Sequence, residues 1–129
     1  MTRRYGLLLL SLFAAACGGE AIAPARPGTL TLQLTTPNAN DGALVVVISG
    51  GTVSTVHPAG NLEVVRQADG SGTHLLLVGD VTAGIVATID VPDIARASAY
   101  VAVVEQAADR TSFALLDPAA YRITIVPAP

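Results

Sequence analysis

Cysteine, tryptophan and lysine are scarce or missing in this chain of 129 residues, which has one Cys and neither Trp nor Lys. A single cysteine excludes a disulfide within the chain, so the fold has to form by packing alone. Three Tyr and two Phe are the only aromatic residues, which leaves little material for the aromatic platforms on which sugars stack. Seven arginines stand against ten acidic residues, and this acidic balance argues against nucleic-acid binding through phosphate contacts.

The chain begins with a leader that is typical of exported proteins. Residues 1–16 combine a basic start at Arg3 and Arg4, an apolar run over residues 7–13 and alanines at residues 14–16. This is the pattern of a signal peptide with a small-residue cleavage site. The apolar run is far shorter than the ~20 residues that span a bilayer. We therefore expect residues 1–16 to be a signal peptide that is removed on export.

Cys17 follows the alanines directly, and Ala15-Ala16-Cys17 resembles the lipobox of bacterial lipoproteins. In that family the cysteine thiol is acylated, and cleavage makes the cysteine the new N-terminus. The resemblance implies that lipid on Cys17 attaches the protein to a membrane, with residues 17–28 as a flexible tether rich in Gly, Ala and Pro. Two alternatives stay open: an ordinary cleaved secretory signal, and a twin-arginine signal, which residues 2–5 match in part.

The same resemblance implies a location in the cell envelope. Gly18 follows the lipidated cysteine, where an aspartate would tend to retain a lipoprotein at the inner membrane. If the host has two membranes, we therefore expect the protein at the outer one.

Residues 29–127 are expected to form one domain of short strands. Thr29–Thr35 alternates leucine with polar residues, which predicts a strand with one buried face. Residues 43–49 are continuously apolar, which predicts a central strand covered on both faces. Over residues 85–91 the odd-numbered positions, starting with Ile85, are expected to face the core. Further strands are predicted over residues 52–56, 61–67, 73–78, 113–116 and 121–126.

The segment between residues 93 and 109 fits either a helix or a strand, because alanines alternate with β-branched residues. We expect one helical turn over residues 93–97 and then a strand over residues 99–106, where β-branched side chains dominate. Eight or nine short strands with frequent turns and no long helix predict an all-β fold, an antiparallel β-sandwich.

The string from Gly79 to Val91, a glycine followed by a strand of alternating apolar residues, is similar to the cohesin-like, Ig-like sandwich domains of secreted bacterial proteins. In cohesins the fold binds a protein module on one sheet face. The resemblance therefore implies a sandwich that engages a protein, and it transfers no individual binding residue.

Three sets of residues have side chains that can bind a metal ion. The first set lies in a turn and the second is a pair of histidines, while the third is acidic: Asn38, Asn40 and Asp41; His57 and His74; Asp80, Asp90 and Asp93. The first set offers oxygen atoms to Ca²⁺, but it lacks the alternating carboxylates and the distal Glu of a dedicated site, so turn formation explains it better. The histidines would need the fold to bring them together. The acidic set would have to meet at one end of the sandwich.

Residues for catalysis are few. Ser49 and Ser71 have glycine neighbours, but neither lies in the Gly-x-Ser-x-Gly pattern of a nucleophile elbow. The glycines of residues 79–84 lack the lysine and the helix of a phosphate-binding loop. We expect no enzyme, no cofactor and no metal, so Cys17 is the one site residue.

The function expected from the sequence is a lipid-anchored, non-catalytic binding or scaffold module of the cell envelope that engages a protein partner. One alternative is a carbohydrate-binding module, for which the aromatic residues outside the leader are Tyr100, Phe113 and Tyr121. Another is an envelope-structural domain with no specific ligand.

Overall fold

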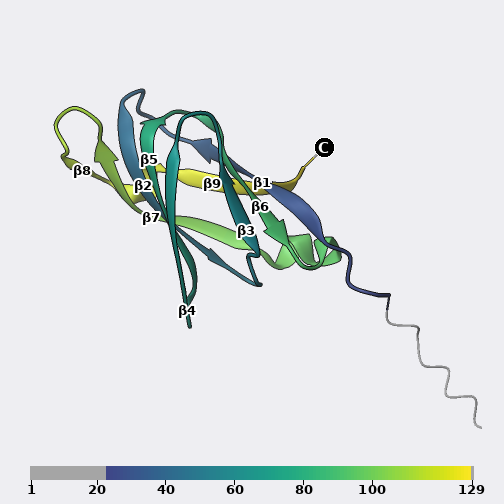
Figure 1. Cartoon of the computed structure of the whole chain (residues 1–129). Coiled ribbons are helices and arrows are strands. Elements are labelled where there is room, and N and C mark those ends of the chain that lie inside the picture. The colour runs from purple at the N-terminus through teal and green to yellow at the C-terminus, as the bar shows by residue number, and fades with distance from the viewer. Residues whose placement is uncertain (1–22, 129) are drawn as a thin grey trace, which may run out of the picture.

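The computed structural model of the protein describes residues 23–128, which form a sandwich of two antiparallel sheets (Figure 1). Its elements are β1 (Gly28–Thr35), β2 (Asp41–Ser49), β3 (Thr55–Pro58), β4 (Glu63–Asp69), β5 (Gly72–Val81), β6 (Gly84–Val91), the 3₁₀ helix η1 (Ile94–Ala99), β7 (Val101–Asp109), β8 (Leu115–Leu116), the 3₁₀ helix η2 (Pro118–Ala120) and β9 (Arg122–Pro127). The strand orders are β3-β6-β1-β9 and β4-β5-β2-β7-β8. These nine strands confirm the predicted all-β sandwich.

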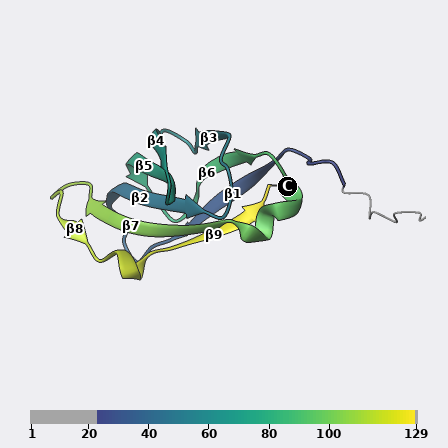
Figure 2. The ribbon, with the colours of Figure 1, turned by 90° about the horizontal axis from the view of Figure 1, so that it is seen from below.

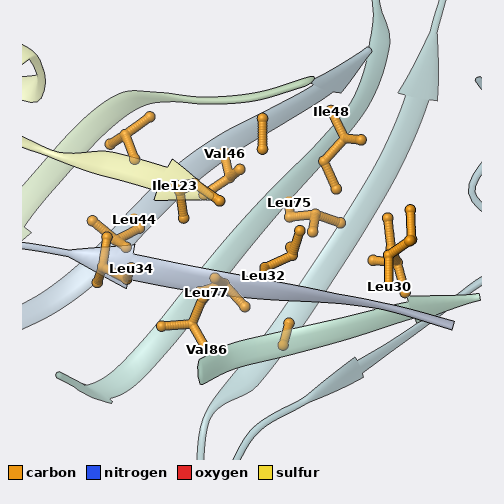
Figure 3. Close-up of a cluster of buried hydrophobic side chains, with 14 of the residues drawn as sticks. Leu30, Leu32, Leu34, Leu44, Val46, Ile48, Leu75, Leu77, Val86 and Ile123 are labelled. Carbon is orange, nitrogen blue, oxygen red and sulfur yellow. The ribbon is translucent and has the colours of Figure 1, made fainter. Parts of the chain in front are cut away.

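The core lies between the two sheets and consists mainly of leucine, valine and isoleucine (Figure 3). From β1, Leu30 and Leu32 are completely buried, as the alternation of that strand predicts. The facing strand β2 contributes Leu44, Val46 and Ile48, which are also completely buried. Each fully buried side chain of this kind stabilises the fold by about 1.5–3 kcal/mol, so packing alone can hold a domain without a disulfide.

The prediction that Ile85 faces the core is wrong, because the pairing of β1 with β6 contains an irregularity. The register pairs Leu32 with Ala87 but Gln33 with Ile85, so Val86 is the extra residue of a bulge. Val86 is buried, while Ile85 is 56 % exposed. From Ala87 onward the expected odd-numbered pattern holds, with Ile89 and Val91 buried.

The prediction that residues 43–49 are covered on both faces is also wrong as far as residues 23–128 are concerned. β2 is central, between β5 and β7, and one side of it faces the core. Its other side carries Ala43, Val45 and Val47, which are half-buried by their neighbours on the two adjacent strands. No layer of described residues packs over them, because β4, β5, β7 and β8 lie in the same sheet.

The ambiguous segment contains both predicted elements in slightly shifted positions. Asp93 caps η1 by accepting a hydrogen bond from the amide of Ala95 at 3.1 Å. The helix extends to Ala99, and β7 then begins at Val101. The expected strands over residues 52–56 and 61–67 begin two or three residues later than predicted, at Thr55 and Glu63.

The end of the expected tether is attached to the domain. The carbonyl of Arg26 accepts a hydrogen bond from the amide of Ile94 at 2.8 Å. Ala23 and Ala25 line a hollow with Gly50, and Tyr100 forms part of the same wall. The segment expected to be flexible up to residue 28 is therefore tied to the start of η1 at Arg26.

Two tyrosines tie loops to opposite ends of the sandwich. At one end, the Tyr121 hydroxyl donates to Asp41 Oδ1 at 2.5 Å, and Thr36 Oγ1 donates to Asp41 Oδ2 at 2.6 Å. Asn38 Nδ2 completes the group by donating to the Tyr121 oxygen at 2.9 Å. Asp41 is completely buried, so these donors replace the water that its carboxyl group loses on folding.

At the other end, the Tyr100 hydroxyl donates to the carbonyl of Thr52 at 2.7 Å and holds the loop between β2 and β3. Burial raises the pKa of both tyrosines, and the Asp41 carboxyl raises that of Tyr121 further. The folded state therefore favours the protonated phenols. Their contribution to stability is complete below the unfolded pKa of about 10 and is lost as the pH rises above it.

We predict that Tyr121→Phe lowers the free energy of unfolding by about 1.5–3 kcal/mol, because it removes a donor to a buried carboxyl group. Tyr100→Phe is the matched control and should cost about 0.5–1.5 kcal/mol, since its acceptor is a neutral carbonyl. Urea unfolding at pH 7 measures both values. Equal losses in the two variants would contradict the special role of the Tyr121–Asp41 contact.

Candidate docking face

The outer faces of the two sheets differ in chemistry. On the four-stranded sheet the outward positions are mostly polar, as expected for a sheet with one solvated side. The register places them in rows across the strands, with His57, Thr88, Thr31 and Val126 in one row and Ile85, Gln33 and Thr124 in another. Apart from Thr31, which its neighbours cover to 4 % exposure, this face has the polar surface that water normally contacts.

On the five-stranded sheet the outward positions are mostly apolar. The register forms three rows across this sheet: Glu63, Val78, Ala43, Ala108 and Leu115; Val65, Leu76, Val45 and Gln106; and Gln67, His74, Val47 and Val103. We call the apolar members of these rows, together with Val101 and Phe113, the outer face. Contiguous exposed apolar surface of this kind marks interaction sites in soluble proteins.

Several side chains of the outer face are strongly exposed. Val65 is 63 % exposed, Val103 54 % and Leu115 77 %. Leu76 and Val78, in the middle of the sheet on β5, still expose more than a third of their surface. Single exposed apolar residues need no explanation, but these are neighbours across five strands.

Small residues in the first row create depressions in the outer face. A hollow of about 90 Å³ lies over Ala43 and Ala108, with Leu76 and Leu115 on its sides. A larger hollow of about 260 Å³ lies beside it, with Val78 and Phe113 among its lining residues. The face therefore has both ridges and hollows, which a complementary surface can fill.

Phe113 is the most exposed large apolar side chain of the described residues, at 80 %. It lies in the loop from β7 to β8 and has a φ of 59°, a left-handed conformation that costs a side chain with a Cβ roughly 1–2 kcal/mol. Strained backbone of this kind is concentrated at functional sites. An exposed aromatic ring held in a strained conformation is therefore the strongest single indication of a binding role.

Asp109 holds that loop in place. Its Oδ1 accepts hydrogen bonds from the amides of Thr111 and Ser112, both at 2.9 Å, and its carbonyl accepts one from the amide of Phe113 at 3.0 Å. The amides of Ser112 and Thr111 keep the pKa of the Asp109 carboxyl below its ordinary value. The contribution of Asp109 to stability is present above pH ~4 and is lost as the pH falls further.

Charged groups lie at the margins of the outer face. Arg110, next to Phe113, pairs with Asp80 and donates to Asn40 Oδ1 at 2.9 Å. Glu63 lies on the edge strand β4, and Glu105 is the bulged residue of β7 between two paired positions. Within the three rows, the residues that can carry charge are Glu63, at the β4 edge, and His74.

The structure does not bring together the metal-ligand candidates. Asn38 and Asp41 bind Tyr121, while Asn40 bonds to Asp109 and Arg110, so the turn residues serve the fold. Of the acidic set, Asp80 pairs with Arg110, Asp90 with His57 at 2.9 Å, and Asp93 caps η1. Over residues 23–128 no three His, Cys, Asp or Glu side chains converge on a possible metal position.

The two histidines lie in different sheets, His57 on β3 and His74 on β5. A hydrogen bond from His57, and to a smaller extent one from Thr29, lowers the pKa of Asp90. A hydrogen bond from the Ser71 hydroxyl lowers the pKa of Asp69. Each histidine therefore has its own carboxylate partner.

Ser71, His74 and Asp69 form a group that contains the residue types of a catalytic triad. The same atom, His74 Nε2, lies 3.2 Å from Ser71 Oγ and 3.0 Å from Asp69 Oδ2. A triad histidine uses its two nitrogens separately, one for the serine and one for the carboxylate. Ser71 also bonds directly to Asp69 at 2.6 Å, so these residues stabilise the β4–β5 turn. Ser49 is exposed at the end of β2.

The aromatic candidates for sugar binding are also accounted for. Tyr100 and Tyr121 are 7 % exposed and their rings belong to the core, which leaves Phe113 as the exposed aromatic residue of the described chain. Cys17, the predicted lipidation site, lies outside the described residues. None of the helices within residues 23–128 has the length and apolar character needed to cross a membrane.

Sequence reasoning missed the outer face. The signal was present in the continuous apolar run of β2 and in the valines of residues 101–104. Comparisons with known proteins found no matching family model, no matching curated protein and no matching solved structure. The similarity to cohesin-like domains is therefore supported only as far as a sandwich of two antiparallel sheets.

We predict that Phe113→Asn gives a more stable domain than Phe113→Ala, by about 1 kcal/mol. Both variants remove the exposed ring, but asparagine tolerates the left-handed conformation that alanine does not. Thermal unfolding of the two variants side by side measures the difference. A more stable Ala variant would show that residue 113 is not held at positive φ.

Proposed function

We propose that this protein is a lipid-anchored, non-catalytic module of the cell envelope that docks a protein partner through the outer face of its five-stranded sheet. The observation that carries the proposal is the contrast between the two sheets. One outer face has the mostly polar surface expected of a solvated sheet, and the other is mostly apolar, with Glu63 and Gln67 confined to its edge strand β4. Such a face is favourable to bury and costly to leave in water.

The position of the attachment supports docking away from the membrane. The chain enters the domain at β1 beside η1, and the β7–β8 loop lies at the opposite end of the sandwich in both views (Figures 1 and 2). If lipid on Cys17 holds the protein, the end that carries Phe113 is the one directed away from the anchor. Gly18 after the cysteine favours the outer membrane where the host has two membranes.

The chemistry of the outer face favours a protein over a carbohydrate partner. Sugar-binding sheets rely on exposed aromatic platforms together with hydrogen-bonding groups. Here the exposed aromatic residue is Phe113 alone, and the rows offer valine, leucine and alanine with few polar atoms. Aliphatic and aromatic side chains with hollows between them are typical of the core of a protein interface.

The described residues also support a non-catalytic role. The hollows lie open on the surface. The charged residues in their linings are the ion pair of Arg110 and Asp80, and Asp109, whose carboxyl group is bound by the amides of its own loop. A domain with no specific ligand remains the second candidate, and it differs from the first in leaving the outer face in water.

Cys17→Ser tests the anchor. We expect the wild-type protein, isolated from membranes, to begin at residue 17 and to carry the added mass of acyl chains, because the cysteine thiol is the attachment point. The Cys17→Ser protein should carry no acyl mass and should lose its detergent-dependent retention in the membrane fraction. Intact-protein mass spectrometry measures both. A wild-type protein without acyl mass would refute lipidation.

Carbene footprinting tests the docking face. We expect peptides that carry Leu76, Val103 and Leu115 to be labelled several-fold less in intact envelopes than in dilute Cys17→Ser protein, because a partner excludes the reagent. Peptides from the other sheet, around Thr124, are the internal control and should be labelled equally in both samples. Equal labelling of both sheets in both samples would mean that nothing covers the outer face.

A further inference from the structure

We propose that the partner on the outer face is a second copy of this chain, so that two anchored domains associate symmetrically through their five-stranded sheets. This inference rests on the docking face proposed above and names its occupant. Three features of the described residues favour a second copy: the distribution of charge, the available area, and the position of Phe113 next to a hollow.

The charge distribution allows two copies to meet. The chain is acidic, with a formal net charge of −3 at pH 7, so most surfaces of one copy repel those of another. Over β5, β2, β7 and β8 the rows of the outer face contain no Asp, Glu or Arg, and the one carboxylate in the rows, Glu63, stands at the edge of the sheet on β4. Their possible cation, His74, is paired with Asp69 at 3.0 Å. The outer face is therefore the part of the described surface where two copies approach with the least repulsion.

The area of the face matches what a dimer needs. Four strands about 4.8 Å apart, each presenting about three outward residues spaced about 6.8 Å, cover roughly 400 Å², and Leu115 on the two-residue strand β8 extends this area slightly. The ring of Phe113, which is 80 % exposed, adds about 150–200 Å² when it is buried. The sum, roughly 600 Å² per partner, lies at the low end of specific interfaces, where association is weak and reversible.

Phe113 supplies a projection beside a hollow. The hollow of about 260 Å³ that borders Phe113 also contains Ala43 and Ala108, whose short side chains leave it open. In a two-fold symmetric contact each copy presents the same patch to the other. A two-fold axis close to this corner brings the Phe113 ring of each copy into the hollow of its partner. For each ring to enter the hollow of the other copy in this way, the Phe113 ring and the hollow have to lie side by side on one molecule, as they do here.

Attachment to a membrane strengthens a contact of this size. Copies held on one surface by lipid meet at a far higher effective concentration than free molecules do. A domain that associates weakly in solution therefore pairs readily when anchored. This makes the contact reversible and dependent on the density of the protein in the membrane.

The test uses two full-length copies with different tags, expressed together in a host that lipidates them. One copy carries the photo-crosslinking amino acid p-benzoylphenylalanine in place of Leu115, which is 77 % exposed and so tolerates a larger side chain. The matched control carries it in place of Thr124, an exposed position on the other sheet. Illumination is followed by purification on one tag, detection of the other, and mass spectrometry.

We expect a product with both tags from the Leu115 position and none from Thr124. Phe113→Asn in both copies should reduce that product at least tenfold, since buried aromatic anchors dominate such interfaces. A product between Leu115 and a different protein would overturn the second-copy proposal and leave the docking function standing. The absence of any product at Leu115 would also overturn it. In that case, protection of the outer face in the footprinting experiment decides whether the docking function stands.

Discussion

The five-stranded sheet is apolar on both of its faces, and the described residues of the chain cover only one of them. The inner face packs Leu44, Val46 and Ile48 against the leucines of β1 and forms the core. The outer face repeats the same chemistry on the opposite side of the same strands. Since removing apolar area from water is favourable, a second covering layer on this face, as we propose, would stabilise the sheet.

The rest of the structure is arranged around that sheet. The four-stranded sheet closes the inner side, and its own outer face is polar. Hydrogen-bonded groups hold both ends, with Tyr121 and Asp41 at one and Tyr100 at the other. The loop with Phe113 is fixed by Asp109 at the corner of the uncovered face. A preformed loop loses little conformational freedom on binding, which favours association.

Much of the fold follows from local patterns in the sequence. The alternation of β1 and the turn residues between strands were sufficient to predict an antiparallel sandwich. The helical turn predicted over residues 93–97 corresponds to η1. The position of Ile85 was not predictable, because the bulge at Val86 depends on how β6 pairs with β1 and not on β6 itself. The positive φ of Phe113 was not predicted either, because phenylalanine is not a residue that favours the left-handed region.

The run of residues 43–49 is the instructive case. Its continuous apolar character predicted a strand covered on both faces, and the described chain covers one. If a second copy supplies the other cover, the sequence pattern describes the associated protein and not the single chain. The candidate site was therefore visible in the sequence, but it could be recognised only after the sheet order showed which face stays open.

Methyl NMR of the Cys17→Ser protein over a range of concentrations tests this account most directly, because it reports on each face separately. Self-association through the outer face predicts that the methyl signals of Val45, Leu76 and Val103 shift as the concentration rises. The signal of Val126, on the outside of the other sheet, should stay in place. Signals that remain unchanged for all four residues, or that move only for Val126, would contradict the central claim.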